Sequence, residues 1–409
     1  MNHTARVTVT LQEPVSLTRR ARTDFHQPSH DHVPGSVLRG ALAARWLQHR
    51  GRPSASGSEF VDVFEAEGSF GPLYAHGTHP IPLSVAHHKY RHEDACEQFW
   101  WDRALRALGE KETMHCPKCG QELEHSKGKA KTLPEHTART RVALDEQGVA
   151  EDGNLFVQNA LAPGMKLTGW LHGAAVRALH LDDEPITTLL LGAGRSVRGQ
   201  ATLEASTDAL PEPVELHDDA VVLRLASPGV FVDRFGFPSD EPDLAEISEV
   251  LGVETTEVVH KWTRWTESGG WHLASGLPKP TERAVERGST FRVQCAEPPS
   301  ERARRTLMAR GLGLRRREGF GALCLPPARP IRLAPRDYVP LRGLKSLPRL
   351  LPTLHNRVED LRNGTADDAW FRNAASQMED GPREALLKLL EVTDPESFKS
   401  ILIELEKRT

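Results

Sequence analysis

The sequence predicts an α+β protein made of two tandem ferredoxin-like units, the RRM-like fold with the order βαββαβ. First, a succession of strand, helix, hairpin, helix, glycine-rich segment and strand occurs twice. Second, the glycine-rich segment before the last strand of each copy is Gly-x-Gly, then arginine, then glycine, in Leu189–Gly199 and in Arg310–Gly321. Third, 409 residues are too many for one small core and suit two domains and a tail. Repetition of a whole unit is hard to produce by chance.

The first unit starts with a strand over Arg6–Leu11, in which Val7, Val9 and Leu11 alternate with polar residues. A helix follows over Ser36–His49, because Leu38, Leu42 and Trp46 recur four apart, and Gly51 can end it. The rest of the unit is predicted as a hairpin of Leu155–Leu161 and Lys166–His172, a short helix over Ile186–Leu191 and a strand over Gln200–Ala205.

The second unit repeats this order. The predicted elements are a strand Val221–Leu225, a helix Leu244–Leu251, strands Trp262–Trp271 and Ser289–Cys295, a helix Glu301–Arg310 and a strand Ala322–Leu325. We therefore expect a first domain over 1–207, with an insertion at about 52–137, and a second domain over 214–335. A helical tail over 336–409 is predicted from the runs Leu347–Leu361, Trp370–Met378, Pro382–Leu390 and Pro395–Lys407.

Composition limits the function classes. The net charge is −4 and the pI about 6.6, so any surface for nucleic acid must be local. No apolar stretch approaches the ~20 residues of a membrane span, and the alternating N-terminus is unlike a signal peptide. We expect a cytoplasmic protein without a membrane partner. Five cysteines argue against a disulfide framework and leave a close pair as a metal site.

The two glycine-rich segments are candidate RNA-binding loops. Glycine lets backbone N–H groups converge on an anion, and arginine adds charge-assisted contacts to phosphate. Seven arginines lie between Arg302 and Arg317, with acids only at Glu301 and Glu318. A dinucleotide fingerprint is excluded, because these glycines follow a helix and precede a strand. The alternative is a turn with solvated arginines. The RNA-binding candidates here are Arg195, Arg198, Gly311, Gly313, Arg315, Arg316, Arg317, Gly319 and Gly321.

The segment Cys116-Pro117-Lys118-Cys119-Gly120 predicts a structural zinc site, because this spacing aims two thiolates at one point. The candidates for completing it are His88, His92, Cys96, His115 and His125, of which we favour His88 and Cys96. A catalytic zinc is disfavoured, since no His-Glu-x-x-His or His-x-Glu pattern is present. The alternative is a vestigial or redox-inert pair.

A polar loop before the first helix, from Arg19 to His32, carries further candidates. Arg19, Arg20 and Arg22 could contact an RNA backbone. His26 could serve as a general acid or base in RNA cleavage, and Asp24 could orient a 2′-hydroxyl or bind a metal. The alternative is a solvated loop, because nothing in the sequence sets a base against a second group.

Together these segments resemble the CRISPR-associated RAMP superfamily. The matching residues are Val33–Leu42, similar to the "PGSxLRGAL" start of the first helix, and Gly311–Gly321, similar to the terminal G-rich loop. Ala150–Phe156, Gly276–Lys279 and Gly288-Ser289 also agree. The Cys-Pro-Lys-Cys-Gly insertion and the double-length layout look most like the large RAMP subunit of type III-D effectors.

The resemblance implies a structural subunit that binds guide RNA (crRNA) in a type III ribonucleoprotein for antiviral defence. It implies as partners a target RNA, other RAMP subunits and the polymerase-like large subunit. Arg39 would lie near RNA or support the first helix. Some members cut RNA with an aspartate or a histidine in the loop that here holds Asp24 and His26, but the surrounding motif does not match.

Three hypotheses follow from the sequence. The first is a noncatalytic RNA-binding scaffold, and the second is an endoribonuclease that cuts target RNA through Asp24 or precursor guide RNA through His26. The third is a zinc-dependent protein-interaction module unrelated to RNA, for which Arg315→Ala with Arg316→Ala would be silent.

Overall fold

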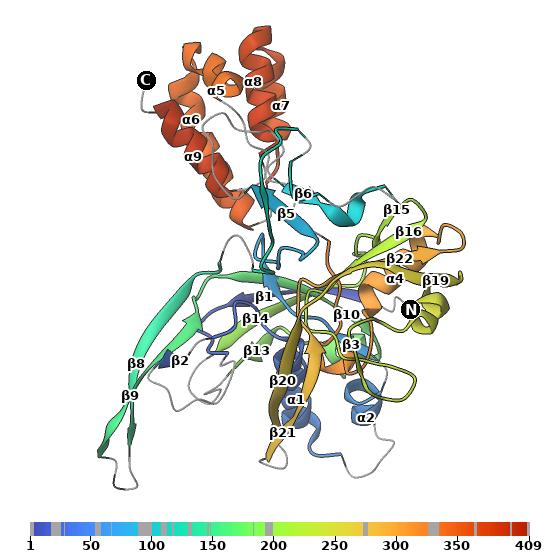
Figure 1. Cartoon of the computed structure of the whole chain (residues 1–409). Coiled ribbons are helices and arrows are strands. Elements are labelled where there is room, and N and C mark those ends of the chain that lie inside the picture. The colour runs from blue at the N-terminus through green and yellow to red at the C-terminus, as the bar shows by residue number, and fades with distance from the viewer. Residues whose placement is uncertain are drawn as a thin grey trace. The chain divides into compact units, whose positions relative to one another are not determined.

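The structure is a computed structural model of the chain (Figure 1). It describes residues 4–17, 26–27, 29–53, 59–66, 68–88, 100–107, 113–116, 118–129, 133–144, 147, 149–182, 184–192, 199–272, 277–325, 335–363, 366–392 and 395–406. The chain forms two compact units, one of residues 1–84 and 127–326 and one of residues 85–126 and 327–409. No helix among the described residues is long and apolar enough to cross a membrane.

The first antiparallel sheet has the order β13-β14-β1-β10-β3, with β4 also paired to β10. Its strands are β1 Thr4–Leu11, β3 Gly68–Phe70, β4 Tyr74–Ala75, β10 Lys166–Gly173, β13 Thr188–Leu190 and β14 Gln200–Ser206. Val7, Val9 and Leu11 are buried while their neighbours are not, so the predicted alternation is confirmed.

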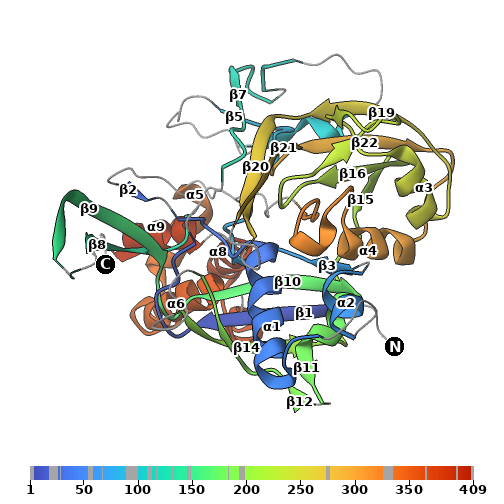
Figure 2. The same ribbon diagram turned by 90° about the horizontal axis from the view of Figure 1, so that it is seen from below.

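Helices α1 Gly35–Arg50 and α2 Glu59–Phe64 cover one face of this sheet (Figure 2). The predicted stripe of Leu38, Leu42 and Trp46 packs into the same core as β1. The 3-10 helix η2 Ala174–Leu179 and the short pair β11 His180–Leu181 and β12 Glu184–Pro185 precede β13. Part of the predicted insertion thus belongs to this core, because α2, β3 and β4 lie within residues 52–84 and Phe64 and Phe70 are buried in it.

Two predictions for the first unit are wrong. Leu155–Leu161 lies in β9 Ala150–Leu161, which pairs with β8 His136–Leu144 and with β2 His26–Gln27 rather than with β10. The residues expected to form a hairpin with it register instead with β1. Ile186–Leu191 contains strand β13, not a helix, because a β-branched run fits an edge pairing with β14.

The second sheet has the order β15-β16-β22-β19. Its strands are β15 Glu215–His217, β16 Ala220–Arg224, β19 Thr255–Trp262 and β22 Thr290–Cys295. Helices α3 Leu244–Leu251 and α4 Glu301–Arg310 have the predicted bounds, and their N-termini are capped by Asp243 and Ser300. Their apolar residues join the sheet in a core separate from the first.

The hairpins of the second unit depart from the prediction. The expected strand Trp262–Trp271 is divided between β19 and β20 Trp265–His272, and β20 pairs with β21 Leu277–Val285. A smaller hairpin joins β17 Phe231–Val232 to β18 Pro238–Ser239. Residues Ala322–Leu325 form no strand; Leu323 makes a single bridge to Leu225 at the end of β16.

The other compact unit combines a small sheet with the tail. The sheet order is β6-β5-β7, from β5 Val85–His88, β6 Trp100–Asp102 and β7 Leu123–His125, and the 3-10 helix η1 Arg103–Leu105 follows β6. The tail forms α5 Pro335–Tyr338, η4 Val339–Gly343, α6 Leu347–Asn363, α7 Ala369–Ser376, α8 Asp380–Leu390 and α9 Pro395–Glu406. Its helices bury their own apolar core, so the predicted helical runs are confirmed.

Candidate functional site

The glycine-rich loop of the second half lies directly against the start of α1 in the first half. A Cβ atom on Gly319 would be 2.6 Å from Cα of Gly35 and 2.9 Å from the carbonyl oxygen of Phe70 in β3. Gly319 also has φ +86°, which favours glycine. The two motifs that resemble the RAMP superfamily, far apart in sequence, therefore meet at a junction that leaves no room for a side chain.

Hydrogen bonds between backbone groups hold the loop at this junction. The N–H of Leu312 donates to the carbonyl of Gly321 at 2.9 Å, and the N–H of Gly321 donates to the carbonyl of Pro228 at 2.8 Å. Between these bonds, Arg316–Glu318 form the 3-10 helix η3. The glycine-rich loop is thus a turn whose backbone N–H groups donate to acceptors within the chain, such as Pro228 and Gly321.

Arg315 ties the loop to β21. Its guanidinium donates to Glu282 at 2.7 Å and forms a two-pronged pair with Glu318 at 3.1 and 2.7 Å, and Lys279 lies 2.5 Å from the same carboxylate. Burial alone would raise the pKa of Glu318, but hydrogen bonds from Arg315 and Lys279 outweigh it and lower that pKa to about 2. Arg315 is consequently an internal contact.

Arg316 ties the loop to α3. It pairs with Glu246 and donates to the carbonyl of Gly313 at 3.1 Å, while the N–H of Gly313 donates to Glu246 at 2.8 Å. Burial raises the pKa of Glu246 despite these donors. The side chains of Arg315 and Arg316 are only 17% and 16% exposed. Neither guanidinium is free for the phosphate contact expected of it.

Arg317 differs from its two neighbours, because 46% of its side chain is exposed. It donates to the carbonyl oxygen of Glu65 at 2.5 Å, and its Nε is 3.7 Å from the Glu65 carboxylate. Arg39 of α1 pairs with the same carboxylate and donates to the carbonyl of Phe64 at 2.9 Å. Two of the predicted RNA-binding arginines, one from each half, therefore converge on Glu65.

A second contact between the halves was missed by sequence reasoning. Arg287 donates two hydrogen bonds to the carboxylate of Asp31 at 2.7 and 2.8 Å, and His32 Nδ1 is 3.0 Å from that carboxylate. Burial would raise the pKa of Asp31, but the bonds from His32 and Arg287 hold it well below its usual range. Asp31 and His32 stand just before the Pro-Gly start of α1, which is the signal that could have drawn attention to them.

An aromatic stack continues this contact. The rings of His32 and Tyr74 stack at 4.7 Å and those of Tyr74 and His79 at 4.6 Å, and the Tyr74 hydroxyl donates to the carbonyl of Ala226 in the second half at 2.5 Å. Burial lowers the pKa of His79 to about 4, so this imidazole is neutral at physiological pH. Through the Tyr74 hydroxyl, this stack contacts the second half.

Most of the remaining predicted residues of the polar loop and of the first glycine segment lie outside the described residues. Asp24 lies outside the described residues, as do the arginines Arg19, Arg20, Arg22, Arg195 and Arg198. His26 begins the short strand β2, whose backbone pairs in parallel with Val157. Catalysis by Asp24 or His26 thus stays a prediction.

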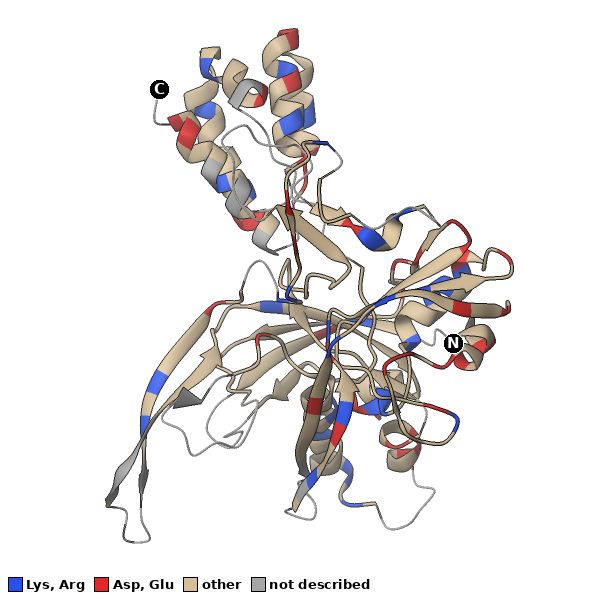
Figure 3. Cartoon of the chain, in the orientation of Figure 1, with Lys and Arg blue, Asp and Glu red and all other residues tan. Residues whose placement is uncertain are grey.

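Basic and acidic positions are interspersed along the ribbon (Figure 3).

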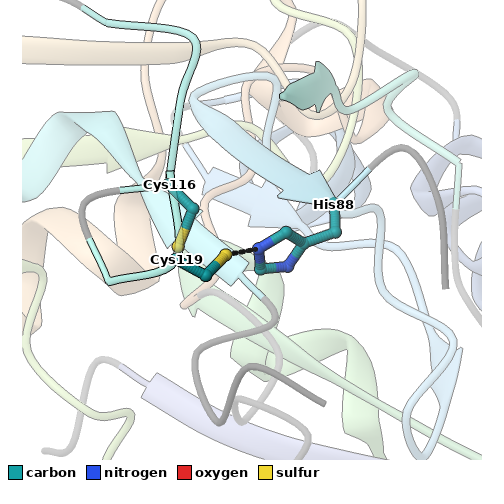
Figure 4. Close-up of side chains that lie close together, drawn as sticks. All are labelled: His88, Cys116 and Cys119. Carbon is teal, nitrogen blue, oxygen red and sulfur yellow. Dashed lines mark hydrogen bonds between the residues drawn. The ribbon is translucent and has the colours of Figure 1, made fainter. Parts of the chain in front are cut away.

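Three of the four predicted metal ligands come together. The ligand atoms of His88, Cys116 and Cys119 lie within 4.8 Å of one another, and Nε2 of His88 is 3.2 Å from Sγ of Cys119 (Figure 4). The fourth, Cys96, lies outside the described residues. Two sulfurs and an imidazole nitrogen are a donor set that Zn²⁺ accepts.

Comparison with known proteins gives one family match. A family model for a CRISPR-associated protein (Cas_Cmr3) matches residues 100–325. A chain in a cryo-EM structure of a type III-B Cmr-beta complex with cognate target RNA and AMPPnP is 15% identical, with a TM-score of 0.42, and the match covers 70% of this chain and 86% of that one. A Cas6-related protein from Pyrococcus furiosus is 10% identical, with a TM-score of 0.29 over 78% and 98% of the chains. No curated protein matches the sequence.

Proposed function

Because the chain belongs to the Cas_Cmr3 family of RAMP-type CRISPR-associated proteins, we propose that it is a guide-RNA-binding structural subunit of a type III effector in antiviral defence. In this proposal the target RNA, other RAMP subunits and the polymerase-like large subunit are its partners. Assignment to type III-D rests on the sequence motifs and remains a prediction, since the matched family is Cmr3.

The strand orders support the proposal that each half is a ferredoxin-like unit. In the first half, β1 and β10 are central, with β14 beside β1 and β3 with β4 beside β10. In the second half, β16 and β22 are central, with β19 beside β22. A βαββαβ unit places its first and third strands in the middle in the same way.

The observation that carries the RNA proposal is the junction of the two motifs at Gly35 and Gly319. It places the exposed Arg317 of the second half beside Arg39 of the first, with one carboxylate, Glu65, between them. Two guanidinium groups against one carboxylate leave a local positive excess, as a phosphate contact requires. We assign RNA contact to Arg317 and positioning of the loop to Arg315 and Arg316, whose carboxylate partners occupy them.

Salt titration of guide-RNA binding tests this proposal. The affinity of the purified full chain for a labelled single-stranded guide is measured over a series of salt concentrations for wild type, Arg317→Ala and Glu65→Gln. Loss of one phosphate contact lowers the slope of log K against log salt by roughly 0.7. We expect that loss for Arg317→Ala, and tighter binding for Glu65→Gln, because the competing carboxylate is gone.

Arg383→Ala is the matched control. Arg383 lies in α8, its side chain is 44% exposed against 46% for Arg317, and it pairs with Asp380 at 2.8 Å. Its removal changes the net charge equally but should leave the slope unchanged. Equal slopes for Arg317→Ala and wild type, or equal losses for Arg317→Ala and Arg383→Ala, would refute a specific contact at the junction.

A further inference from the structure

We propose that His88, Cys116 and Cys119 form a structural zinc site that joins strand β5 to the turn containing the two cysteines. Tetrahedral Zn²⁺ with bonds of ~2.3 Å to sulfur and ~2.0 Å to nitrogen sets its ligand atoms about 3.5–3.8 Å apart. The three ligand atoms lie within 4.8 Å of one another, and Nε2 of His88 is 3.2 Å from Sγ of Cys119. These separations bracket the spacing that a bound ion requires.

The turn is built to present both sulfurs to one side. The N–H of Cys116 donates to the carbonyl of Gln121 and the N–H of Gly120 donates to the carbonyl of Cys116, each at 2.8 Å. Gly120 has φ +70°, which lets the chain reverse immediately after Cys119. The N–H of Leu123 closes the turn on the carbonyl of Met114 at 2.8 Å. Figure 4 shows His88 approaching this turn from the end of its own strand.

The small sheet has few buried apolar residues among those that the structure describes, so a cross-link would stabilise it. Its strands β5, β6 and β7 have four, three and three residues. The core around it consists of Ala86, Cys116 and Leu123, with Trp101 and Met114 packed against them. Small folds with a core of this size are commonly stabilised by a bound metal ion.

The three donors favour zinc as the metal, and they leave its fourth coordination position to a ligand outside this group. Thiolate and imidazole ligands select Zn²⁺ over Mg²⁺ or Ca²⁺, which take oxygen. Cys116 and His88 are buried, whereas Cys119 is exposed, so two ligands anchor the ion inside the segment. The exposed His115 and His125, also considered from the sequence, do not join the group among the described residues.

Metal content and cobalt spectroscopy test the site on the full chain. Wild type should carry one zinc per chain and, after replacement by Co²⁺, show the absorption of tetrahedral cobalt with a thiolate charge-transfer band. Cys116→Ser, Cys119→Ser and His88→Ala should each weaken zinc binding at least tenfold. His115→Ala is the matched control and should bind as wild type does.

A rescue variant keeps the test decisive if the loss variants fold poorly. His88→Cys should retain zinc and strengthen the thiolate-to-cobalt band, because a third sulfur joins the ion. The proposal would be overturned by wild type without stoichiometric zinc, by a cobalt complex without a thiolate band, or by equal losses in His88→Ala and His115→Ala. No arm of this experiment uses RNA, so its outcome is independent of the proposed function.

Discussion

Replacement of Gly319 by alanine tests the junction between the glycine-rich loop and α1. The added methyl group would lie 2.6 Å from Cα of Gly35, 2.9 Å from its nitrogen and 2.9 Å from the carbonyl oxygen of Phe70. All three are backbone atoms, which cannot rotate away as a flexible side chain would. The substitution must therefore displace the loop from α1 and β3.

The expected loss in the free energy of unfolding of Gly319→Ala has two parts. A non-glycine residue at φ +86° costs roughly 1–2 kcal/mol, and overpacking against fixed atoms costs roughly 1–3 kcal/mol. The free energy of unfolding should fall by about 2–5 kcal/mol in total. Gly236 offers a matched control, because it has φ +84° but no atom within 4 Å of the place where a methyl group would be added. Gly236→Ala should therefore show only the cost of placing a non-glycine residue at positive φ.

The assay is urea denaturation, with unfolding monitored by tryptophan fluorescence. A third variant, Gly40→Ala in α1, has neither a positive φ nor a neighbour within 4 Å. It should stabilise the protein by roughly 0.5–1 kcal/mol through helix propensity. If Gly319→Ala is no more destabilising than Gly236→Ala, the contact between the two motifs is not as described.

Three further predictions concern the buried groups and the polar loop. The pKa of His79 falls from 6.5 to about 4 on folding, so the free energy of unfolding should be highest above pH 6.5 and should fall by roughly 3 kcal/mol as the pH drops to 4. In urea melts, the free energy of unfolding of His79→Gln should depend less on pH over this range. An unchanged pH dependence would contradict the burial of a neutral imidazole. Asp31→Asn leaves the Arg287 cation buried without its carboxylate and should cost roughly 3–5 kcal/mol in denaturant melts, whereas a loss below about 1 kcal/mol would refute the ion pair. Labelled complementary RNA incubated with a reconstituted effector should be cut equally with wild type, Asp24→Ala and His26→Ala, and loss of cleavage in either variant would identify an endoribonuclease.

Elements with strong local signals were predictable from the sequence. The helices α3 and α4 begin and end at the predicted residues, because capping residues and apolar periodicity both mark them. The stripe of Leu38, Leu42 and Trp46 likewise specified the buried face of α1.

Strand pairing was not predictable in the same way. The proximity of β9 and β10 in sequence suggested a hairpin, yet β10 pairs with β1, a strand at the opposite end of the first domain's sequence. Each strand alone carries the same alternation whichever partner it takes, so periodicity could not decide between them. The strand β13 was mistaken for a helix because its short apolar run fits either period.

In the candidate site, too, the sequence predicted local features but not contacts between distant residues. The glycines at 311–321 predicted a loop, but the contact of Gly319 with Gly35 is one that no local pattern reveals. The arginine run suggested three phosphate ligands, whereas the fold brings Glu282 to Arg315 and Glu246 to Arg316, and Glu318 of the loop itself also binds Arg315. Charge in the sequence therefore overstated the charge available at the surface.

Photo-crosslinking of a 4-thiouridine-substituted guide RNA in the assembled effector, followed by mass spectrometry of this subunit, tests the central claim most directly. We expect crosslinked peptides from the loop over 311–321 and from the start of α1, and their loss in Arg317→Ala but not in Arg383→Ala. Crosslinks confined to other surfaces, or none on this subunit, would contradict guide binding at the junction of the two halves.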